Sequence, residues 1–214
     1  GFPADKIVFA GVGKADWEIN LGLDNDIFCF NVESAVELEI INELAAAKHK
    51  VASIALRINP EVDAHTHAKI TTGMKENKFG INLSQLGGVL DKLKEMKNVK
   101  LIGIHSHIGS QITDMSSFRN LVIRFNEIQE ELEAHGVTVE NLNFGGGLGI
   151  DYYHPNHLSI PAFDNYFAAI HKLLQVRPGQ QVHFEPGRSI VAQCGTLISK
   201  VLCQGRRDEE IRYP

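Results

Sequence analysis

Apolar residues follow two alternating patterns along the chain, which predict short strands separated by amphipathic helices. The predicted strands are rich in β-branched and aliphatic residues and cover 7–10, 27–32, 51–58, 99–104, 137–144 and 181–184. The predicted helices repeat their apolar positions every three or four residues and cover 16–21, 33–48, 85–96, 118–132 and 163–174. Ser84 is the expected N-cap of the third helix, and Gly136 is the expected glycine after the fourth. Because strands and helices alternate throughout, we expect parallel strands joined by right-handed crossovers, in an open doubly wound sheet or a closed (β/α)8 barrel.

Polar or glycine residues follow every predicted strand, and this favours the barrel. The segments are 11–14, 33–34, 57–60, 105–110, 145–149 and 185–188. In a (β/α)8 barrel the carboxyl ends of all strands meet at one rim, where binding sites are built. A closed barrel needs eight strands and about 250 residues, whereas six strands are predicted in these 214 residues. We therefore expect an α/β fold that forms a partial (β/α)8 TIM barrel.

Composition and charge are those of an ordinary soluble globular protein. Hydrophobic residues make up 43% of the chain and charged residues 22%, and the net charge of −5 suggests no surface for nucleic acid or membrane. The cysteines Cys29, Cys194 and Cys203 show no C-x-x-C spacing, which argues for reduced thiols and against a disulfide scaffold or structural zinc. No apolar run reaches membrane-spanning length. We expect a soluble cytoplasmic protein.

The glycine run from Gly145 to Gly149 follows a predicted strand and is the first candidate for a binding site. Its three consecutive glycines, Gly145, Gly146 and Gly147, allow backbone N–H groups to converge on an anion such as a phosphate. The run does not match the dinucleotide fingerprint G-x-G-x-x-G, because Ile150 or Tyr152 takes the place of the third glycine. The alternative is a glycine bend needed only for packing.

Two histidines, His105 and His107, follow the predicted strand 99–104. Residues two apart on a strand face the same way, so both imidazoles can point to one site. Together with His65 and His67 they suggest a metal-dependent barrel hydrolase, although the other strand ends offer glycines, an arginine and a glutamate rather than further ligands. The alternatives are a histidine that lies flat against an aromatic ring, and, for His105, a hydrogen-bonded residue packed at the rim.

The segment 184–188 reads Phe-Glu-Pro-Gly-Arg and places Glu185 and Arg188 at the end of the last predicted strand. Taken alone, these two charges suggest only a surface ion pair. Taken with the glycine run and with Ser110, which follow the two preceding strands, they indicate a cofactor with a phosphate at one end and a protonatable ring nitrogen at the other.

Several motifs in this order resemble the pyridoxal-phosphate (PLP)-dependent decarboxylases of the alanine-racemase-like barrel type. The main ones are 105–112, 144–149 and 185–188, supported by 13–14, 31–34, 57–60, 65–67 and 77–81. The resemblance covers about residues 1–203, and the tail 204–214 departs from the family's pattern. Within the family the chain is most similar to the diaminopimelate-specific members, because Ser106 and Leu148-Gly149 stand where ornithine- and arginine-specific members tend to carry Phe and Phe-Pro.

The resemblance implies a role for each residue of these motifs. The phosphate of PLP would be held by Gly145, Gly146, Gly147 and Ser110, with Pro186, Gly187 and Arg188 nearby. His107 would stack on the pyridine ring, and Glu185 would face the ring nitrogen and favour its protonated form. Arg188 would also bind a substrate carboxylate. Arg57 and Lys78 are expected near the site, and no metal is expected.

The implied reaction is the decarboxylation of meso-2,6-diaminopimelate to L-lysine and CO2 by a homodimer. In the family the Schiff-base lysine lies on the first barrel strand and a C-terminal β domain completes the site, and Lys14 does not match the lysine motif. We therefore expect an inactive fragment that lacks the first two barrel strands and the C-terminal β domain and self-associates through exposed sheet edges. The alternatives are an ornithine- or arginine-type decarboxylase, a non-catalytic PLP-binding paralogue, and the metal-dependent hydrolase.

Overall fold

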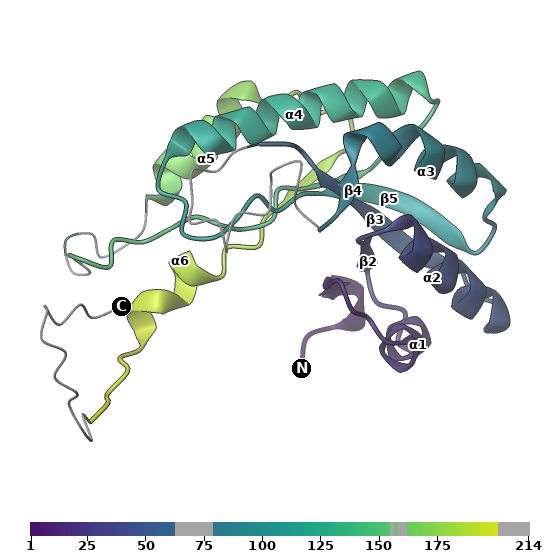
Figure 1. The fold of residues 1–214 in the computed structure, drawn as a ribbon, viewed down its shortest axis with the longest axis horizontal. Helices are drawn as coiled ribbons and strands as arrows, with labels where there is room; N and C mark the ends of the chain where they lie inside the picture. The colour runs from purple at the N-terminus through teal and green to yellow at the C-terminus, as the bar shows by residue number, and fades with distance from the viewer. Residues whose placement is uncertain (63–78, 155–156, 158–161, 201–214) are drawn as a thin grey trace, which may run out of the picture.

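All six predicted strands are present and parallel in the computed structural model, which describes residues 1–62, 79–154, 157 and 162–200 (Figure 1). They are β1 Val8–Phe9, β2 Cys29–Val32, β3 Ala52–Asn59, β5 Val99–His105, β6 Asn141–Asn143 and β7 Gln181–His183. A short further strand, β4 Ile81–Asn82, pairs with the end of β3.

The order of the strands in the sheet decides between the two folds that the sequence left open. It runs β1-β2-β3-β5-β6-β7, so each of these strands lies beside the one before it in the path. A doubly wound sheet reverses direction at a switch point, whereas a barrel adds strands in sequence order. The fold is therefore a partial (β/α)8 barrel, as expected, and β1 and β7 are the edges of the described sheet.

Helices connect successive strands and cover one face of the sheet (Figure 1). They are α1 Asp16–Asp24, α2 Ala35–Ala47, α3 Leu83–Glu95, α4 Met115–Ala134 and α5 Phe163–Leu173. The short helix α6 Arg188–Val191 follows β7, and 3-10 turns lie at Ala4–Lys6 and Ala192–Cys194. Within the described part of the chain, no helix is both long enough and apolar enough to cross a lipid bilayer.

Two helix ends can be compared with the expectations from sequence. Gly136 follows α4 with φ +74°, the left-handed conformation expected of a glycine in that place. The expected N-cap Ser84 is wrong, because α3 starts at Leu83 with Asn82 as its N-cap. The reason is that the Gln85 side chain accepts a hydrogen bond from the Asn82 N–H (3.4 Å), which extends the helix start by two residues. The short helix α6 has no counterpart among the helices predicted from the sequence.

The strands separate apolar from polar side chains by their two-residue period. Alternate residues such as Phe30, Leu56, Ile104 and Leu142 are buried in the main core against the helices. The opposite face carries a small apolar cluster of Cys29, Ala55 and Ile102, and the buried polar residues Asn31, His105, Asn141 and Asn143. Chemistry-bearing side chains are therefore concentrated on the face that the helices do not cover.

A β-bulge in β5 controls which way His105 points. Ile54 pairs with Leu101, but the next residue, Ala55, pairs with Gly103, so Ile102 is an extra residue in the ladder. Val99 and Leu101 pack on the helix side, and without the bulge His105 would follow them there. The extra residue shifts the alternation, so Ile104 packs on the helix side and His105 lies on the polar face.

Candidate functional site

The carboxyl ends of β5, β6 and β7 bring together the loops that carry the candidate residues. The register is level at this point, since His105 pairs with Asn143 and Asn143 pairs with His183. The glycine run follows β6 and therefore lies between the segments 106–110 and 184–188. Phe144, which precedes the glycines, is fully buried and stacks on Phe125 of α4 with ring centroids 4.0 Å apart. This contact fixes the start of the glycine loop to the helical layer.

The three glycines are required by the close packing of these loops. A Cβ atom at Gly145, Gly146 or Gly147 would come within 3.0 Å of a backbone carbonyl oxygen of Ser106, Glu185 or Gly109, respectively. Gly145 and Gly147 also have φ values of +65° and +109°, which side chains rarely allow. Packing therefore explains the run by itself, and it leaves room for a binding role only through the backbone N–H groups.

Two of the three glycine N–H groups already have partners inside the chain. The Gly145 N–H donates to Asn143 Oδ1 (2.9 Å), and the Gly146 N–H donates to His107 Nδ1 (3.3 Å). The Gly147 N–H has no hydrogen-bond partner among the described residues. Of the three glycine N–H groups, the one of Gly147 is therefore the donor that the loop can offer to an anion.

Glu185 is held by two polar side chains of the neighbouring strands. Asn143 Nδ2 donates to its Oε1 (2.8 Å), and His105 Nε2 lies 3.5 Å from its Oε2. Burial raises the pKa of the Glu185 carboxyl, but the contacts with His105, Asn143 and His107 outweigh burial and lower the pKa to about 2. The side chain is 38% exposed, so the ionised carboxylate is accessible to a ligand.

His107 is kept neutral by its surroundings. Burial, which is the largest cause, and the nearby cationic Arg57 together lower the pKa of His107 to about 4, although Glu185 opposes the shift. Because His107 Nδ1 accepts the Gly146 N–H, the proton of the neutral ring lies on Nε2. His105 is 2% exposed, and its Nδ1 has no partner within the described part of the chain.

Arg188 and Ser110 meet on the other side of the glycine loop. Arg188 donates to Ser110 Oγ from Nε (3.2 Å) and from Nη2 (3.1 Å), and its Nη1 donates to the Tyr152 hydroxyl (2.6 Å). Because Ser110 Oγ accepts both bonds, its own O–H proton remains available to a ligand. This cluster offers positive charge and hydroxyl donors, which suit an anion.

The remaining predicted residues are Arg57 and Ser106 at the ends of neighbouring strands, the loop residues Pro186 and Gly187, and three residues outside the described chain. Arg57 donates through Nη1 to both carboxylate oxygens of Glu33 (2.7 and 2.8 Å), and both side chains are largely buried. The Ser106 hydroxyl donates to the Ile58 carbonyl (2.7 Å) and is buried, so it supports the strand instead of lining the site. Lys78, His65 and His67 fall among residues 63–78, outside the described residues. Pro186 and Gly187 lie in the loop between Glu185 and Arg188.

Three residues that the sequence patterns did not indicate, Asn143, Tyr152 and Glu33, hold residues of the site in the structure. Asn143 links Glu185 to the glycine loop, Tyr152 holds Arg188, and Glu33 holds Arg57. The signal for Asn143 was present in the two-residue period of β6, which places this amide on the same face as the strand-end histidine. Tyr152 and Glu33 lie in loops, where no periodicity indicates direction.

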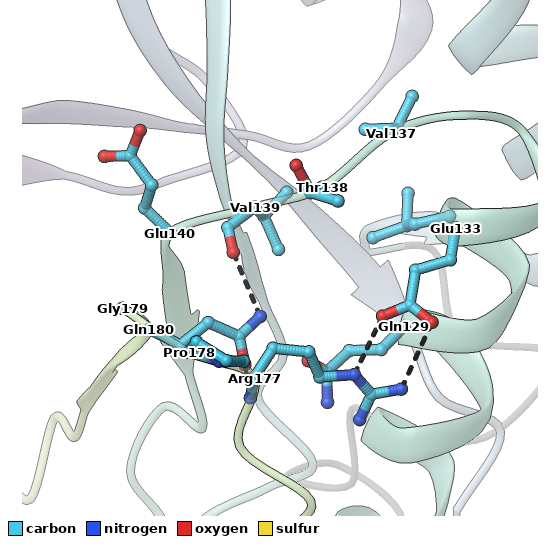
Figure 2. Close-up of a pocket in the computed structure, with 11 residues that line it drawn as sticks. Gln129, Glu133, Val137, Thr138, Val139, Glu140, Arg177, Pro178, Gly179 and Gln180 are labelled. Carbon is cyan, nitrogen blue, oxygen red and sulfur yellow. Dashed lines mark hydrogen bonds and ion pairs between the residues drawn. The ribbon is translucent and has the colours of Figure 1, made fainter.

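A cavity of about 400 Å³ lies at the opposite ends of the same strands. Figure 2 shows it between α4, the segment 137–140 before β6 and the segment 177–180 before β7. Its walls are tied by Arg177, which pairs with Glu133 (Nε to Oε1, 2.8 Å), and by Gln180, which donates to the Val139 carbonyl (3.0 Å). Since barrel sites are built at the carboxyl ends of the strands, this cavity is separate from the candidate site.

The candidate site therefore has two chemically different ends. Ser110, Arg188 and the Gly147 N–H donate hydrogen bonds at one end, and the Glu185 carboxylate accepts at the other. Such a set fits a ligand that carries an anionic group and a protonated ring nitrogen. His107 lies between the two ends through its bond to Gly146.

Comparison with known proteins agrees with this chemistry. Residues 1–192 match the family described as "Pyridoxal-dependent decarboxylase, pyridoxal binding domain". The diaminopimelate decarboxylase of Bacteroides thetaiotaomicron is 64% identical over 202 residues, which are 94% of this chain and 52% of that protein. The corresponding enzyme of Haemophilus influenzae is 42% identical over 94% of this chain and 48% of its own length.

Solved structures give the same result. Diaminopimelate decarboxylase from Helicobacter pylori complexed with L-lysine has a TM-score of 0.81 at 37% identity, over 90% of this chain and 48% of that one. The arginine decarboxylase of Paramecium bursaria Chlorella virus has a TM-score of 0.70 at 25% identity, over 88% and 47%. The chain spans about half the length of the relatives it matches. A metal-dependent hydrolase is therefore set aside: the chain belongs to the family of pyridoxal-dependent decarboxylases, within its pyridoxal-binding domain.

Proposed function

We propose that this chain is the pyridoxal-binding part of an enzyme that decarboxylates meso-2,6-diaminopimelate to L-lysine and CO2. The observation that carries the proposal is the convergence of Glu185, His107, Ser110 and Arg188 at the carboxyl ends of three adjacent strands. The 64% identity to a diaminopimelate decarboxylase supports this substrate over ornithine or arginine. We also propose that the enzyme is a cytoplasmic homodimer, as the family resemblance implies.

The residues present fit the phosphate end of PLP. Among the residues that the structure describes, the Gly147 N–H and the Ser110 O–H have no acceptor, and Arg188 adds a positive charge beside them. A phosphate accepts several hydrogen bonds, and a guanidinium is a preferred partner for it. Pro186 and Gly187 set the turn that brings Arg188 back to Ser110. Arg188 also reaches Tyr152, and we assign this pair to the carboxylate of the substrate.

The residues also fit the pyridine-ring end of PLP. PLP supplies an electron sink for the electrons released when CO2 departs, and this sink is strongest when its ring nitrogen is protonated. The low pKa of Glu185 keeps its carboxylate ionised across the physiological pH range, so this residue would favour the protonated form of a ring nitrogen bound beside it. His107 presents a neutral imidazole, so it adds no positive charge next to the protonated ring. Arg57 and Lys78 remain proposed neighbours of the site.

A chimera tests this function. Residues 1–203 replace the corresponding segment of the Bacteroides thetaiotaomicron enzyme, and CO2 release is measured from diaminopimelate, ornithine and arginine. We expect release from diaminopimelate alone, and a loss of about a hundredfold or more in kcat in the Glu185→Gln variant, with PLP still bound. A folded, PLP-loaded chimera that prefers ornithine or arginine would refute the substrate assignment. A chimera that binds no PLP would refute the cofactor site.

A further inference from the structure

We propose that Asn143 is a positioning residue that sets the Glu185 carboxylate at a fixed place relative to the glycine loop. The inference rests on the proposed function, because Asn143 would link the two ends of the proposed cofactor site. Asn143 itself is 7% exposed and lies at the end of β6, behind both ends of the site.

Three hydrogen bonds form a closed ring around Asn143. Asn143 Nδ2 donates to Glu185 Oε1 (2.8 Å), the Glu185 N–H donates to the Gly145 carbonyl (2.8 Å), and the Gly145 N–H donates to Asn143 Oδ1 (2.9 Å). One side chain thus binds the glutamate that would face the ring nitrogen and the first glycine of the loop that would hold the phosphate. The distance between the two ends is fixed by this amide.

This closed set of hydrogen bonds requires an amide side chain at position 143. Oδ1 must accept from a backbone N–H while Nδ2 donates to a carboxylate, so the amide has only one orientation that satisfies both partners. Aspartate could still accept from Gly145, but its second oxygen would face the Glu185 carboxylate, and two carboxylates at this distance cannot both be ionised. Alanine would remove both bonds. Asn143→Asp therefore keeps the contact with Gly145 and loses the contact with Glu185, so the two contacts can be tested separately.

Asn141 supplies a matched control on the same strand and the same face. Its Nδ2 donates to the Ile102 carbonyl (3.0 Å), and its Oδ1 lies 2.8 Å from His183 Nε2, so it makes two hydrogen bonds of its own but none to Glu185. Loss of either asparagine removes comparable bonding from the sheet. Only loss of Asn143 should change the position and charge of Glu185.

The test uses the chain of residues 1–214 and two measurements. The first is amide hydrogen exchange without ligand. Exchange at Gly145 should become at least about tenfold faster in Asn143→Ala but stay slow in Asn143→Asp, which keeps the acceptor. Asn141→Ala should leave Gly145 unchanged. Equal exchange rates at Gly145 in Asn143→Ala and Asn141→Ala would overturn the inference.

The second measurement uses pyridoxamine 5′-phosphate, which carries the ring and the phosphate but no aldehyde. Binding should weaken about tenfold in both Asn143 variants. The 15N shift of the labelled ring nitrogen should show its pKa falling by about one unit in both, but not in Asn141→Ala. If Asn143→Ala does not fold, Asn143→Asp decides, and an unchanged ring-nitrogen pKa in that variant would overturn the inference. Absence of binding to the unsubstituted chain would instead overturn the proposed cofactor site.

Discussion

Gly146→Ala tests the packing of the site loops most directly. The added Cβ would lie within 3.0 Å of the Glu185 carbonyl oxygen and 3.1 Å from its carbonyl carbon, and backbone atoms cannot rotate away as a side chain would. The loops after β6 and β7 must therefore separate. That movement stretches the bond from the Glu185 N–H to the Gly145 carbonyl, now 2.8 Å.

The size of the effect follows from two contributions. Forcing extra volume into a packed site costs about 1–3 kcal/mol, and losing one buried backbone hydrogen bond costs about 1 kcal/mol more. Replacing glycine by alanine also restricts the unfolded chain, which returns roughly 0.4–1 kcal/mol. We expect the free energy of unfolding to fall by about 1–3.5 kcal/mol in Gly146→Ala.

Gly88→Ala is the matched control, because Gly88 lies inside α3 and nothing lies within 4 Å of its added Cβ. In Gly88→Ala the backbone of the unfolded chain is restricted in the same way, and alanine favours the helix. The free energy of unfolding should therefore rise by about 0.5–1 kcal/mol. Urea unfolding followed by circular dichroism measures both variants, with unchanged m values as the check on two-state behaviour. Equal stabilities of the two variants would refute the close contact between the loops.

Two further predictions concern charges near the strand ends. Between pH 6.5 and about 4, the free energy of unfolding should decrease by up to about 3 kcal/mol less in His107→Gln than in the unsubstituted chain, as measured by urea unfolding at several pH values. In that range His107 binds a proton in the unfolded chain but not in the folded chain, where its pKa is lowered, so stability falls as the pH falls. An unchanged dependence of the free energy of unfolding on pH in the variant would contradict this. Lys14→Met should cost about 3–5 kcal/mol, because the Lys14 side chain, 1% exposed, pairs with the largely buried side chain of Glu37, 13% exposed (2.5 Å). The exposed Lys48–Asp24 pair supplies the control, since Lys48→Met should cost less than about 1 kcal/mol, and similar costs for both would refute the burial argument.

The sequence predicted the elements and the rim well, because both follow from local patterns. Apolar periodicity located all the described strands except the short β4, and the polar residues after the strands located the loops that meet at the site. Level register then brings Ser110, the glycine run and Glu185 together, as parallel strands in sequence order must. The partial barrel was therefore predictable from strand order and loop chemistry.

The directions of individual side chains were not predictable in the same way. His105 faces the site only because Ile102 is an extra residue in β5, and a bulge depends on pairing with the neighbouring strand. The bond between Asn143 and Glu185 joins residues 42 apart in sequence. The sequence left open whether the glycines bind an anion or serve only packing, and the contacts that require them, with three loops approaching each other, join distant segments. Such contacts depend on tertiary structure, which no local pattern contains.

The alternation along the strands has a consequence for how such a protein can diverge. Leu56, Ile104 and Leu142 hold the helices, while their next neighbours Arg57, His105 and Asn143 face the uncovered side. Substitutions in the second set can change what is bound while the first set keeps the layers together. A lineage can therefore explore new specificities one residue at a time without first giving up its fold.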